Sequence, residues 1–216
     1  MTTGTGLSAA ILIGGRASRM GGVRKGTLTI GGRTIVERQL EVLRGVADTI
    51  FAVASSSTEP DAALPVVRDR FPDHGALGGI YTAIVSSPSD RTLIVACDLP
   101  FLDASLLTHM AGIDADLVIP RTARGYEPLC AVYGRACAEP IRRRLEHGAL
   151  EASVLPEGVK VAEIAPEALA AYDADGLLFV NVNTPHDYER ARLLLEQQSL
   201  ERRFARRDRI MDELGP

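Results

Sequence analysis

A glycine-rich stretch directly after a short apolar run constrains what this chain can fold into more than any other feature. The apolar run over 9–13 (AAILI) is long enough for a buried strand and too short for a capped helix. In the stretch LIGGRASRMGGVRKG over 12–26, the glycines permit positive φ and let a ligand come close to the main chain. The same loop carries four basic side chains, which are Arg16, Arg19, Arg24 and Lys25. A strand followed by such a loop predicts a phosphate-binding site.

Two familiar glycine motifs do not describe this loop. A Walker A loop needs Ser or Thr after its lysine to bind magnesium, but Gly26 follows Lys25. The GxGxxG fingerprint of dinucleotide-binding proteins is also absent. The loop instead resembles the LxGG, RMG and lysine signature of the nucleotidyltransferases that make nucleotide-linked cofactors and sugars. The matching positions are Leu12, Gly14, Gly15, Arg19, Met20, Gly21 and Lys25.

Length and charge narrow the class of protein. A chain of 216 residues with 46% hydrophobic content has the size of one large α/β domain with a substantial core. We expect a single domain over 1–216, with a core over about 7–192 and a charged, solvated helix or tail over about 193–216. The formal charge of -4 argues against a nucleic-acid-binding protein, which would show a basic excess. An anionic ligand must therefore be held by a local basic loop.

Cysteine usage and the N-terminus indicate a cytoplasmic protein. Cys97, Cys130 and Cys137 give an odd count without a CxxC pair, which predicts neither a disulfide framework nor a zinc site. The N-terminus has no basic region, and its apolar run breaks at Gly14 and Gly15. We therefore expect no signal peptide, no membrane span and no membrane partner.

Strands and helices alternate through the first half of the chain. Strands are predicted over 9–13, 49–54, 65–68, 92–97, 117–120, 127–133, 159–164 and 177–182, and helices start near Thr34, Gly75, Asp103, Ala136 and Thr184. Thr34 and Glu37 have the spacing of a capping box. Such alternation predicts a parallel sheet with right-handed crossovers. The expected fold class is a single-domain, Rossmann-like, three-layer α/β/α fold with a mostly parallel, mixed sheet.

In such sheets the ligand binds beyond the carboxyl ends of the strands. This rule places on one rim the Gly14 loop, Ser55, Asp69, Asp98 and Asn181. Gly78 belongs to a second glycine-rich segment, GALGG over 75–79, whose backbone N–H groups can face an anion at a helix start.

Asp98 ends a buried apolar strand immediately before Leu99 and Pro100, and a carboxylate there needs a cation. Magnesium commonly binds one or two carboxylates together with substrate phosphates, so Asp98 is the expected Mg²⁺ ligand. The alternative is that Asp98 caps the following turn. In nucleotidyl transfer, Arg19, Lys25 and Mg²⁺ would offset the charge that develops on the transferred phosphate.

Within the nucleotidyltransferases, the sequence from about Leu7 to Arg190 is most similar to molybdenum cofactor guanylyltransferase. The similarity rests on the glycine-rich loop, Asp69 with GALGGI, and the segments CDLPFL, EPLCAVY and NVNTPHD. It implies a nucleotidyltransferase fold and transfer of GMP from GTP to the phosphate of molybdopterin, with release of pyrophosphate. The implied roles are nucleotide binding by Leu12, Ile13, Gly14, Gly15 and Lys25, guanosine binding by Asp69, magnesium binding by Asp98, and pterin binding by Asn181 and Asn183.

Several alternatives stay open at this stage. The Gly14–Gly15 pair favours GTP by resemblance only, because cytidylyl relatives tend to carry Ala-Gly there. A cytidylyltransferase, an enzyme acting on a cobinamide or sugar phosphate, and a non-catalytic nucleotide-binding module are the other hypotheses. Scattered histidines give no support for a hydrolase triad. The resemblance implies GTP and molybdopterin as ligands, molybdenum-insertion or molybdoenzyme chaperone proteins as partners, and a monomer or weak homo-oligomer.

Overall fold

The computed structural model describes residues 6–13, 25–54, 64–173 and 175–197. Its main sheet has the strand order β10-β7-β9-β6-β1-β4-β5, with β8 paired to β7. These strands are β1 (Leu7–Ile13), β4 (Thr49–Ala54), β5 (Val66–Arg68), β6 (Arg91–Ala96), β7 (Leu117–Thr122), β8 (Gly125–Tyr126), β9 (Cys130–Gly134) and β10 (Val161–Ile164). Strands β6, β1, β4 and β5 pair in parallel, while β9 is antiparallel to both β6 and β7. The mostly parallel, mixed sheet predicted from the sequence is confirmed.

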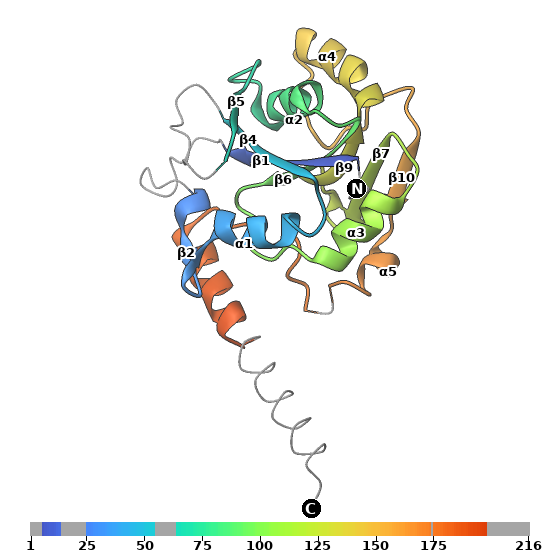
Figure 1. Ribbon diagram of the computed structural model, residues 1–216. Helices are drawn as coiled ribbons and strands as arrows, with labels where there is room; N and C mark the ends of the chain where they lie inside the picture. The colour runs from blue at the N-terminus through green and yellow to red at the C-terminus, as the bar shows by residue number, and fades with distance from the viewer. Residues whose placement is uncertain (1–5, 14–24, 55–63, 174, 198–216) are drawn as a thin grey trace, which may run out of the picture.

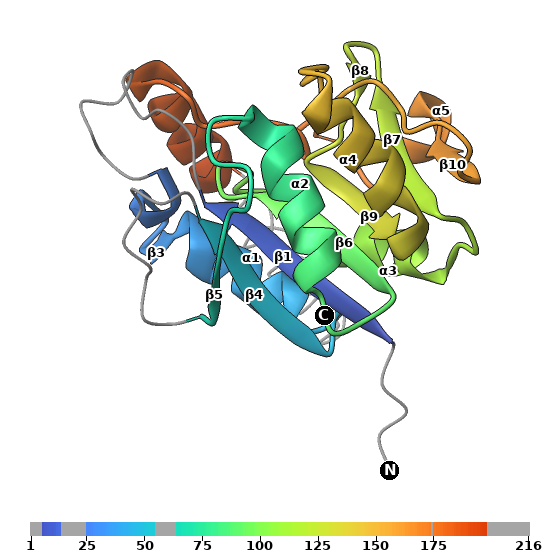
Figure 2. The same ribbon diagram turned by 90° about the horizontal axis from the view of Figure 1, so that it is seen from above.

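Helices cover both faces of this sheet. They are α1 (Ile35–Leu43), α2 (Gly75–Ser86), α3 (Ala104–Gly112), α4 (Ala138–Glu146), α5 (Pro166–Leu169) and an unlabelled helix over 185–197, with short 3-10 turns η2 (Lys25–Thr27) and η3 (Arg135–Cys137). Figure 1 shows α2 and α4 above the sheet and α1 and α3 below it, and Figure 2 looks down on α2 and α4. The three-layer α/β/α architecture is therefore confirmed. None of the helices within the described ranges is long and apolar enough to cross a bilayer.

Strand β1 lies at the centre of the sheet and is buried from both sides. Ala9 and Ile11 pack into the cluster that contains α1 and α3, whereas Ala10 packs into the cluster that contains α2 and α4. Successive side chains of a strand point to opposite faces, so a strand covered on both faces must be apolar throughout. The continuous apolar run over 9–13 is explained by this position.

The predicted helix caps form with the expected residues. The Thr34 hydroxyl accepts from the Glu37 amide at 3.1 Å, and the Glu37 carboxylate accepts from the Thr34 amide at 2.7 Å. This amide lowers the pKa of Glu37. Asp103 caps α3 by accepting from the Leu106 amide at 2.8 Å. Gly45 follows the C-cap of α1 at Arg44 but does not take the positive φ that a glycine cap uses.

The prediction of a strand over 177–182 is wrong. The amides of Leu177 and Leu178 both donate to Asp173 Oδ1, and the Val180 amide donates to the Leu177 carbonyl, so the backbone turns instead of joining the sheet. Leu178 and Phe179 are buried in the cluster below the sheet. Apolar residues therefore mark burial here, without the ladder of hydrogen bonds that a strand needs.

The segment between the strands predicted over 117–120 and 127–133 forms a hairpin. Strand β7 continues to Thr122, and Arg121 and Thr122 pair with Tyr126 and Gly125 of β8. Gly125 has a φ of 123°, which favours glycine at this turn. The strand expected over 127–133 begins only at Cys130.

The helix over 185–197 starts as predicted and packs against a distant hairpin. Thr184 Oγ1 accepts from the Asp187 amide at 3.1 Å, and Pro185 occupies the first helical position. The Tyr188 hydroxyl donates to the Thr29 carbonyl at 2.8 Å, which ties the helix to the hairpin of β2 (Thr29–Ile30) and β3 (Arg33–Thr34). Of the predicted C-terminal helix or tail, 193–197 is helical and 198–216 lies outside the described residues.

The three cysteines are expected to be unreactive in the folded protein. Cys97, Cys130 and Cys137 are all buried, and burial raises the pKa of Cys130 and of Cys137 to about 12. Because the thiolate is the nucleophile, Ellman's reagent at mildly alkaline pH should modify none of them rapidly in native protein and all three in guanidinium chloride. Rapid modification of the native protein would contradict this packing.

Candidate functional site

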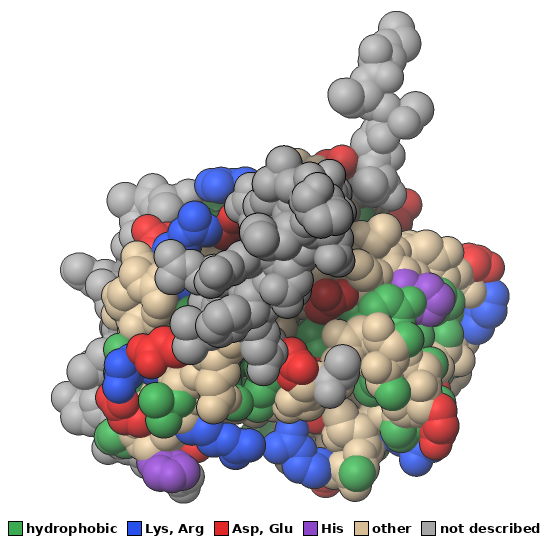
Figure 3. Space-filling view, turned by 90° about the horizontal axis from the view of Figure 1, so that it is seen from below, with side chains coloured by type: hydrophobic (Ala, Val, Ile, Leu, Met, Phe, Trp, Pro, Cys, Tyr) green, Lys and Arg blue, Asp and Glu red, His purple; other side chains and the backbone are tan. Residues whose placement is uncertain are grey.

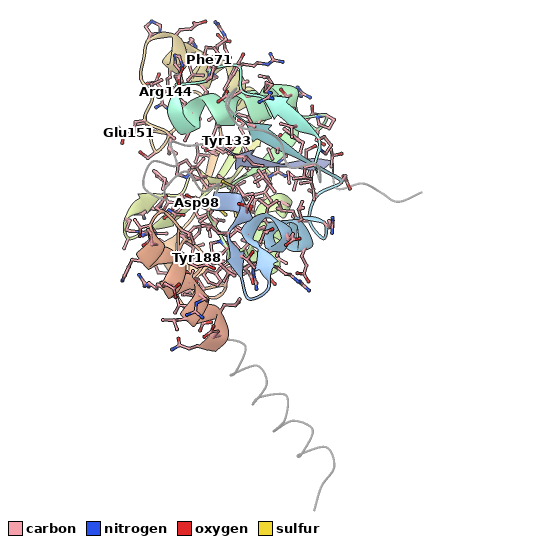
Figure 4. All side chains as sticks on the ribbon, turned by 90° about the vertical axis from the view of Figure 1, so that its left-hand side faces the viewer. Phe71, Asp98, Tyr133, Arg144, Glu151 and Tyr188 are labelled. Atoms are coloured by element: carbon pink, nitrogen blue, oxygen red, sulfur yellow. The ribbon has the colours of Figure 1, made fainter. Side chains whose placement is uncertain are left out.

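The parallel strands deliver two acidic residues to one edge of the sheet. Asp69 directly follows β5 and Asp98 lies two residues after the end of β6, and these strands run parallel to β1 and β4 between them. Figure 4 looks toward this edge, with Asp98 near the middle and Tyr188 of the C-terminal helix below it. The edge is the one at which the sequence predicts a ligand.

A single buried side chain holds the turn that carries Asp98. Gln39 of α1 is 1% exposed, and its Nε2 donates to the carbonyls of Ala96 at 2.7 Å and Leu99 at 2.9 Å. The Cys97 amide donates to the Leu12 carbonyl at 3.2 Å, which fixes the turn to the end of β1. The backbone position of Asp98 is therefore defined from both neighbouring elements.

The segment that begins at Lys25 packs against this same turn. A methyl group built on Gly26 would lie 3.6 Å from Cys97 Cβ and 2.7 Å from Val36 Cγ2. Glycine at position 26 therefore lets η2 approach the strand end closely. The backbone of Lys25 and the turn that carries Asp98 consequently share one side of the molecule.

Several residues predicted for the site cannot be compared with the fold. Gly14, Gly15, Arg19 and Ser55 lie outside the described residues. Of the other residues predicted to bind the nucleotide, Leu12 and Ile13 are the last residues of β1 and are partly buried, each against a different face of the core.

Asp69 organises the loop that leads into α2. Its Oδ1 accepts from the Phe71 amide at 3.0 Å and from the hydroxyl of Thr82 in α2 at 2.8 Å. Gly78 is buried at the start of α2, where an added methyl group would lie 2.5 Å from the Phe71 carbonyl oxygen. The N-cap residue His74 makes no side-chain cap, so the loop positions the first amides of α2 at the ligand edge without a capping side chain.

A cavity of about 480 Å³ lies beside the Asp98 turn. Its walls come from the β7–β8 turn, the segment over 173–183 and the first turns of the helix over 185–197. Asn181 and Asn183 both line it, and the Val182 amide between them donates to the Asp98 carbonyl at 3.0 Å. The structure thus brings the two predicted asparagines next to the Asp98 turn, although they follow a loop rather than a strand.

Sequence reasoning missed the charged residues of this cavity, which are Arg124, Asp173, Asp187 and Arg190. Although burial acts to raise it, the pKa of Asp187 is lowered by the Thr184 hydroxyl and by the amides of Asn183 and Thr184. Glu127, behind the β7–β8 turn, has its pKa raised by burial, which outweighs its hydrogen bond from Thr122. The signal available in the sequence for Arg124 was the polar RTARGY segment over 121–126, which lies between two predicted strands.

The acidic residues present suit a metal that is shared with a substrate. Within the described part of the chain, no three His, Cys, Asp or Glu side chains gather as metal ligands. A carboxylate such as Asp98 therefore fits magnesium only if substrate phosphates supply further oxygen ligands.

The surface below the sheet carries both signs of charge. Figure 3 shows acidic and basic side chains interspersed over this face. Such a mixture among the described residues of this face agrees with the formal charge of -4.

Comparison with known proteins identifies the family. The model of the MobA-like NTP transferase domain matches residues 9–161, which is most of the described fold. The chain belongs to the MobA-like NTP transferase family. The match begins in β1 and ends at the first residue of β10, so it includes every other strand of the main sheet in full.

Relatives within this family share most of their length with the chain. A molybdenum cofactor guanylyltransferase of Desulfosudis oleivorans is 34% identical over 189 residues, covering 86% of this chain and 94% of the relative. The crystal structure of molybdopterin-guanine dinucleotide biosynthesis protein A from Archaeoglobus fulgidus has a TM-score of 0.71 at 26% identity, covering 88% of this chain and 99% of that one.

The fold extends to a more distant transferase. The 2-C-methyl-D-erythritol 4-phosphate cytidylyltransferase of Thermus thermophilus has a TM-score of 0.63 at 16% identity, covering 87% of this chain and 98% of that one. The nucleotidyltransferase fold that the family resemblance implies is confirmed.

Removing the Gln39 amide should destabilise this MobA-like fold. Gln39→Leu takes both donations away from the buried Asp98 turn, so the free energy of unfolding should fall by about 1–3 kcal/mol. Urea denaturation measures the change. Glu41→Gln on the same helix removes only an exposed ion pair with Arg33 and should stay within about 0.5 kcal/mol of wild type. Equal stability of the two variants would contradict the assigned role of Gln39.

Proposed function

We propose that this protein transfers GMP from GTP to the phosphate of molybdopterin, giving molybdopterin guanine dinucleotide and pyrophosphate. The observation that carries the chemistry is the packing of the η2 segment, which starts at Lys25, against the turn that carries Asp98. This packing supports a site that the signature lysine and the candidate metal ligand share at one edge of the sheet. The substrates are inferred from relatives named molybdenum cofactor guanylyltransferase, which match the chain over most of its length.

The reaction needs two polyanions aligned more than it needs covalent chemistry from the protein. An oxygen of the acceptor phosphate attacks the α-phosphorus of GTP, and the bond from that phosphorus to the bridging oxygen breaks as pyrophosphate leaves. Lys25 and Arg19 would offset the negative charge that grows on the α-phosphate and the leaving group. Magnesium held by Asp98 would supply further charge neutralisation at the phosphates.

The nucleotide end of the site is assigned to the glycine-rich loop and its neighbours. The residues proposed to hold GTP are Leu12, Ile13, Gly14, Gly15, Lys25, Ser55, Asp69 and Gly78. The proposal is supported by the amide-rich start of α2, which lacks a side-chain cap and follows the loop that Asp69 organises. Backbone N–H groups at a helix start favour phosphate.

The acceptor end is assigned to the cavity beside the Asp98 turn. Asn181 and Asn183 line this cavity and are proposed to face the pterin, whose ring edge offers donors and acceptors to amide side chains. We also propose that the protein works as a monomer or weak homo-oligomer and exchanges its pterin with molybdenum-insertion or molybdoenzyme chaperone proteins.

The choice of nucleotide and acceptor is tested directly by turnover. Purified protein with Mg²⁺ and molybdopterin should release pyrophosphate with GTP and not with CTP, because the site is expected to read guanine. Coupled detection of pyrophosphate and chromatography of the dinucleotide product measure the reaction. Release with CTP alone would overturn the proposed nucleotide, and release with GTP in the absence of molybdopterin would overturn the proposed acceptor.

Removing the charge of Asp98 should abolish most of the turnover. Asp98→Asn keeps the shape of the side chain but loses the anionic metal ligand, so kcat should fall on the order of a hundredfold or more. Asp90→Asn, at the other end of β6, removes an exposed partner of Arg135 and is the matched control, expected to retain wild-type kcat. Pyrophosphate release over a range of Mg²⁺ concentrations gives both values. Unchanged turnover in Asp98→Asn would count against the metal assignment.

A further inference from the structure

The cavity beside the Asp98 turn contains two arginines that the proposed function does not use. Arg124 lies at the β7–β8 turn and Arg190 lies on the helix over 185–197, so the two cations come from different walls. The cavity volume of about 480 Å³ is within the range of small-molecule sites. The two arginines therefore face a space large enough for a small ligand.

The two acids of the cavity are already engaged by the main chain. Asp173 Oδ1 accepts from the amides of Leu177 and Leu178, at 2.6 and 3.0 Å. Asp187 Oδ2 accepts from the amides of Asn183 and Thr184, at 3.1 and 2.9 Å. These amide dipoles offset part of the negative charge that would otherwise balance the two arginines.

Arg124 is held in place while most of its side chain stays accessible. Its Nη2 donates to the Phe179 carbonyl at 3.1 Å and lies 3.6 Å from Glu127 Oε1. The Arg124 side chain is nevertheless 71% exposed, and a guanidinium group has five N–H donors. Donors therefore remain for a ligand in the cavity.

Arg190 and Arg192 lie on the same helix but differ in their ion pairs. Arg192 pairs with Glu189 and Glu196, whereas Arg190 forms no ion pair with any residue of the described ranges. Arg190 lines the cavity and Arg192 does not. One helix thus carries one arginine that is neutralised at the surface and one that is available to an anion.

The chemistry of the transfer requires cations on the acceptor side. Lys25, Arg19 and Mg²⁺ serve the triphosphate in the proposed mechanism. A phosphate monoester that approaches a triphosphate is repelled by it, and this repulsion has to be offset before an in-line attack is possible. Arginine suits this role because its planar fork matches two phosphate oxygens.

We infer that Arg124 and Arg190 bind the phosphate monoester of the acceptor and place it beside the Asp98 turn. The inference rests on the proposed function, since it assigns the cavity to the acceptor rather than to the nucleotide. The two arginines then allow the site to distinguish a phosphorylated pterin from an unphosphorylated one.

A pair of fluorescent pterins tests the inference without turnover. Neopterin 3′-monophosphate and neopterin differ only in the phosphate, so the ratio of their dissociation constants isolates its contribution. The full-length wild-type protein should bind the phosphorylated compound about tenfold or more tightly, as expected for one charged hydrogen-bonded contact. Fluorescence titration measures both constants.

The variants decide whether the arginines carry this preference. Arg124→Gln keeps a polar side chain that can donate hydrogen bonds but removes the charge, and Arg190→Ala removes the second cation. Each should lose most of the preference for the phosphorylated pterin without changing neopterin binding. Arg192→Ala, on the same helix but paired outside the cavity, should retain the preference. Circular dichroism and thermal unfolding check that every variant is folded.

The outcomes separate this inference from the proposed function. A preference that survives in Arg124→Gln and Arg190→Ala, or no preference in wild type, overturns the inference. Steady-state assays with molybdopterin then test the proposed function independently. A raised KM for molybdopterin at unchanged KM for GTP supports the arginine assignment. Wild-type KM for molybdopterin in both variants overturns the assignment while leaving the transferase activity intact, and absence of transfer in wild type overturns the proposed function itself.

Discussion

The hydrogen bonds from the Gln39 amide to two carbonyls of the Asp98 turn are the constraint on which the rest of this site depends. A buried amide that spans Ala96 and Leu99 fixes where the chain leaves β6, and hence where a carboxylate can stand beyond the sheet. The close approach of Gly26 and the donation from Val182 to the Asp98 carbonyl both use this fixed turn. Three stretches that are far apart in the sequence therefore meet around one turn of the backbone.

The sheet explains why both halves of the site lie at the same edge. Parallel strands joined by crossover helices place their carboxyl ends together, which gathers the end of β1, Asp69 and Asp98. Strand β9 is antiparallel to both β6 and β7, so β7 runs in the same direction as β6. The end of β7 therefore contributes Thr122 and Arg124 to the cavity on the same side. One sheet edge can in this way serve a nucleotide and a second substrate.

Much of the fold was predictable because local signals and tertiary structure agree. The apolar runs of β1, β4 and β6 are strands because helices cover both of their faces, and Thr34, Asp103 and Thr184 cap helices through their own side chains. The strand prediction over 177–182 failed because a run of apolar residues indicates burial and cannot distinguish a paired strand from a buried turn. The charged side chains of the cavity were missed for a similar reason. Arg124 and Arg190 are surface arginines by every local measure, and only the fold brings them to one space.

The contact between the C-terminal helix and the β2–β3 hairpin has a consequence for biosynthesis. The Tyr188 hydroxyl and the Thr29 carbonyl that it contacts are separated by 159 positions along the chain. During translation this contact forms only after the helix over 185–197 has been synthesised, because distant contacts need the intervening chain. The β2–β3 hairpin therefore lacks this anchor until then. A ribosome-bound fragment that ends before Tyr188 would expose the apolar side of this hairpin, including Ile30, to other nascent chains.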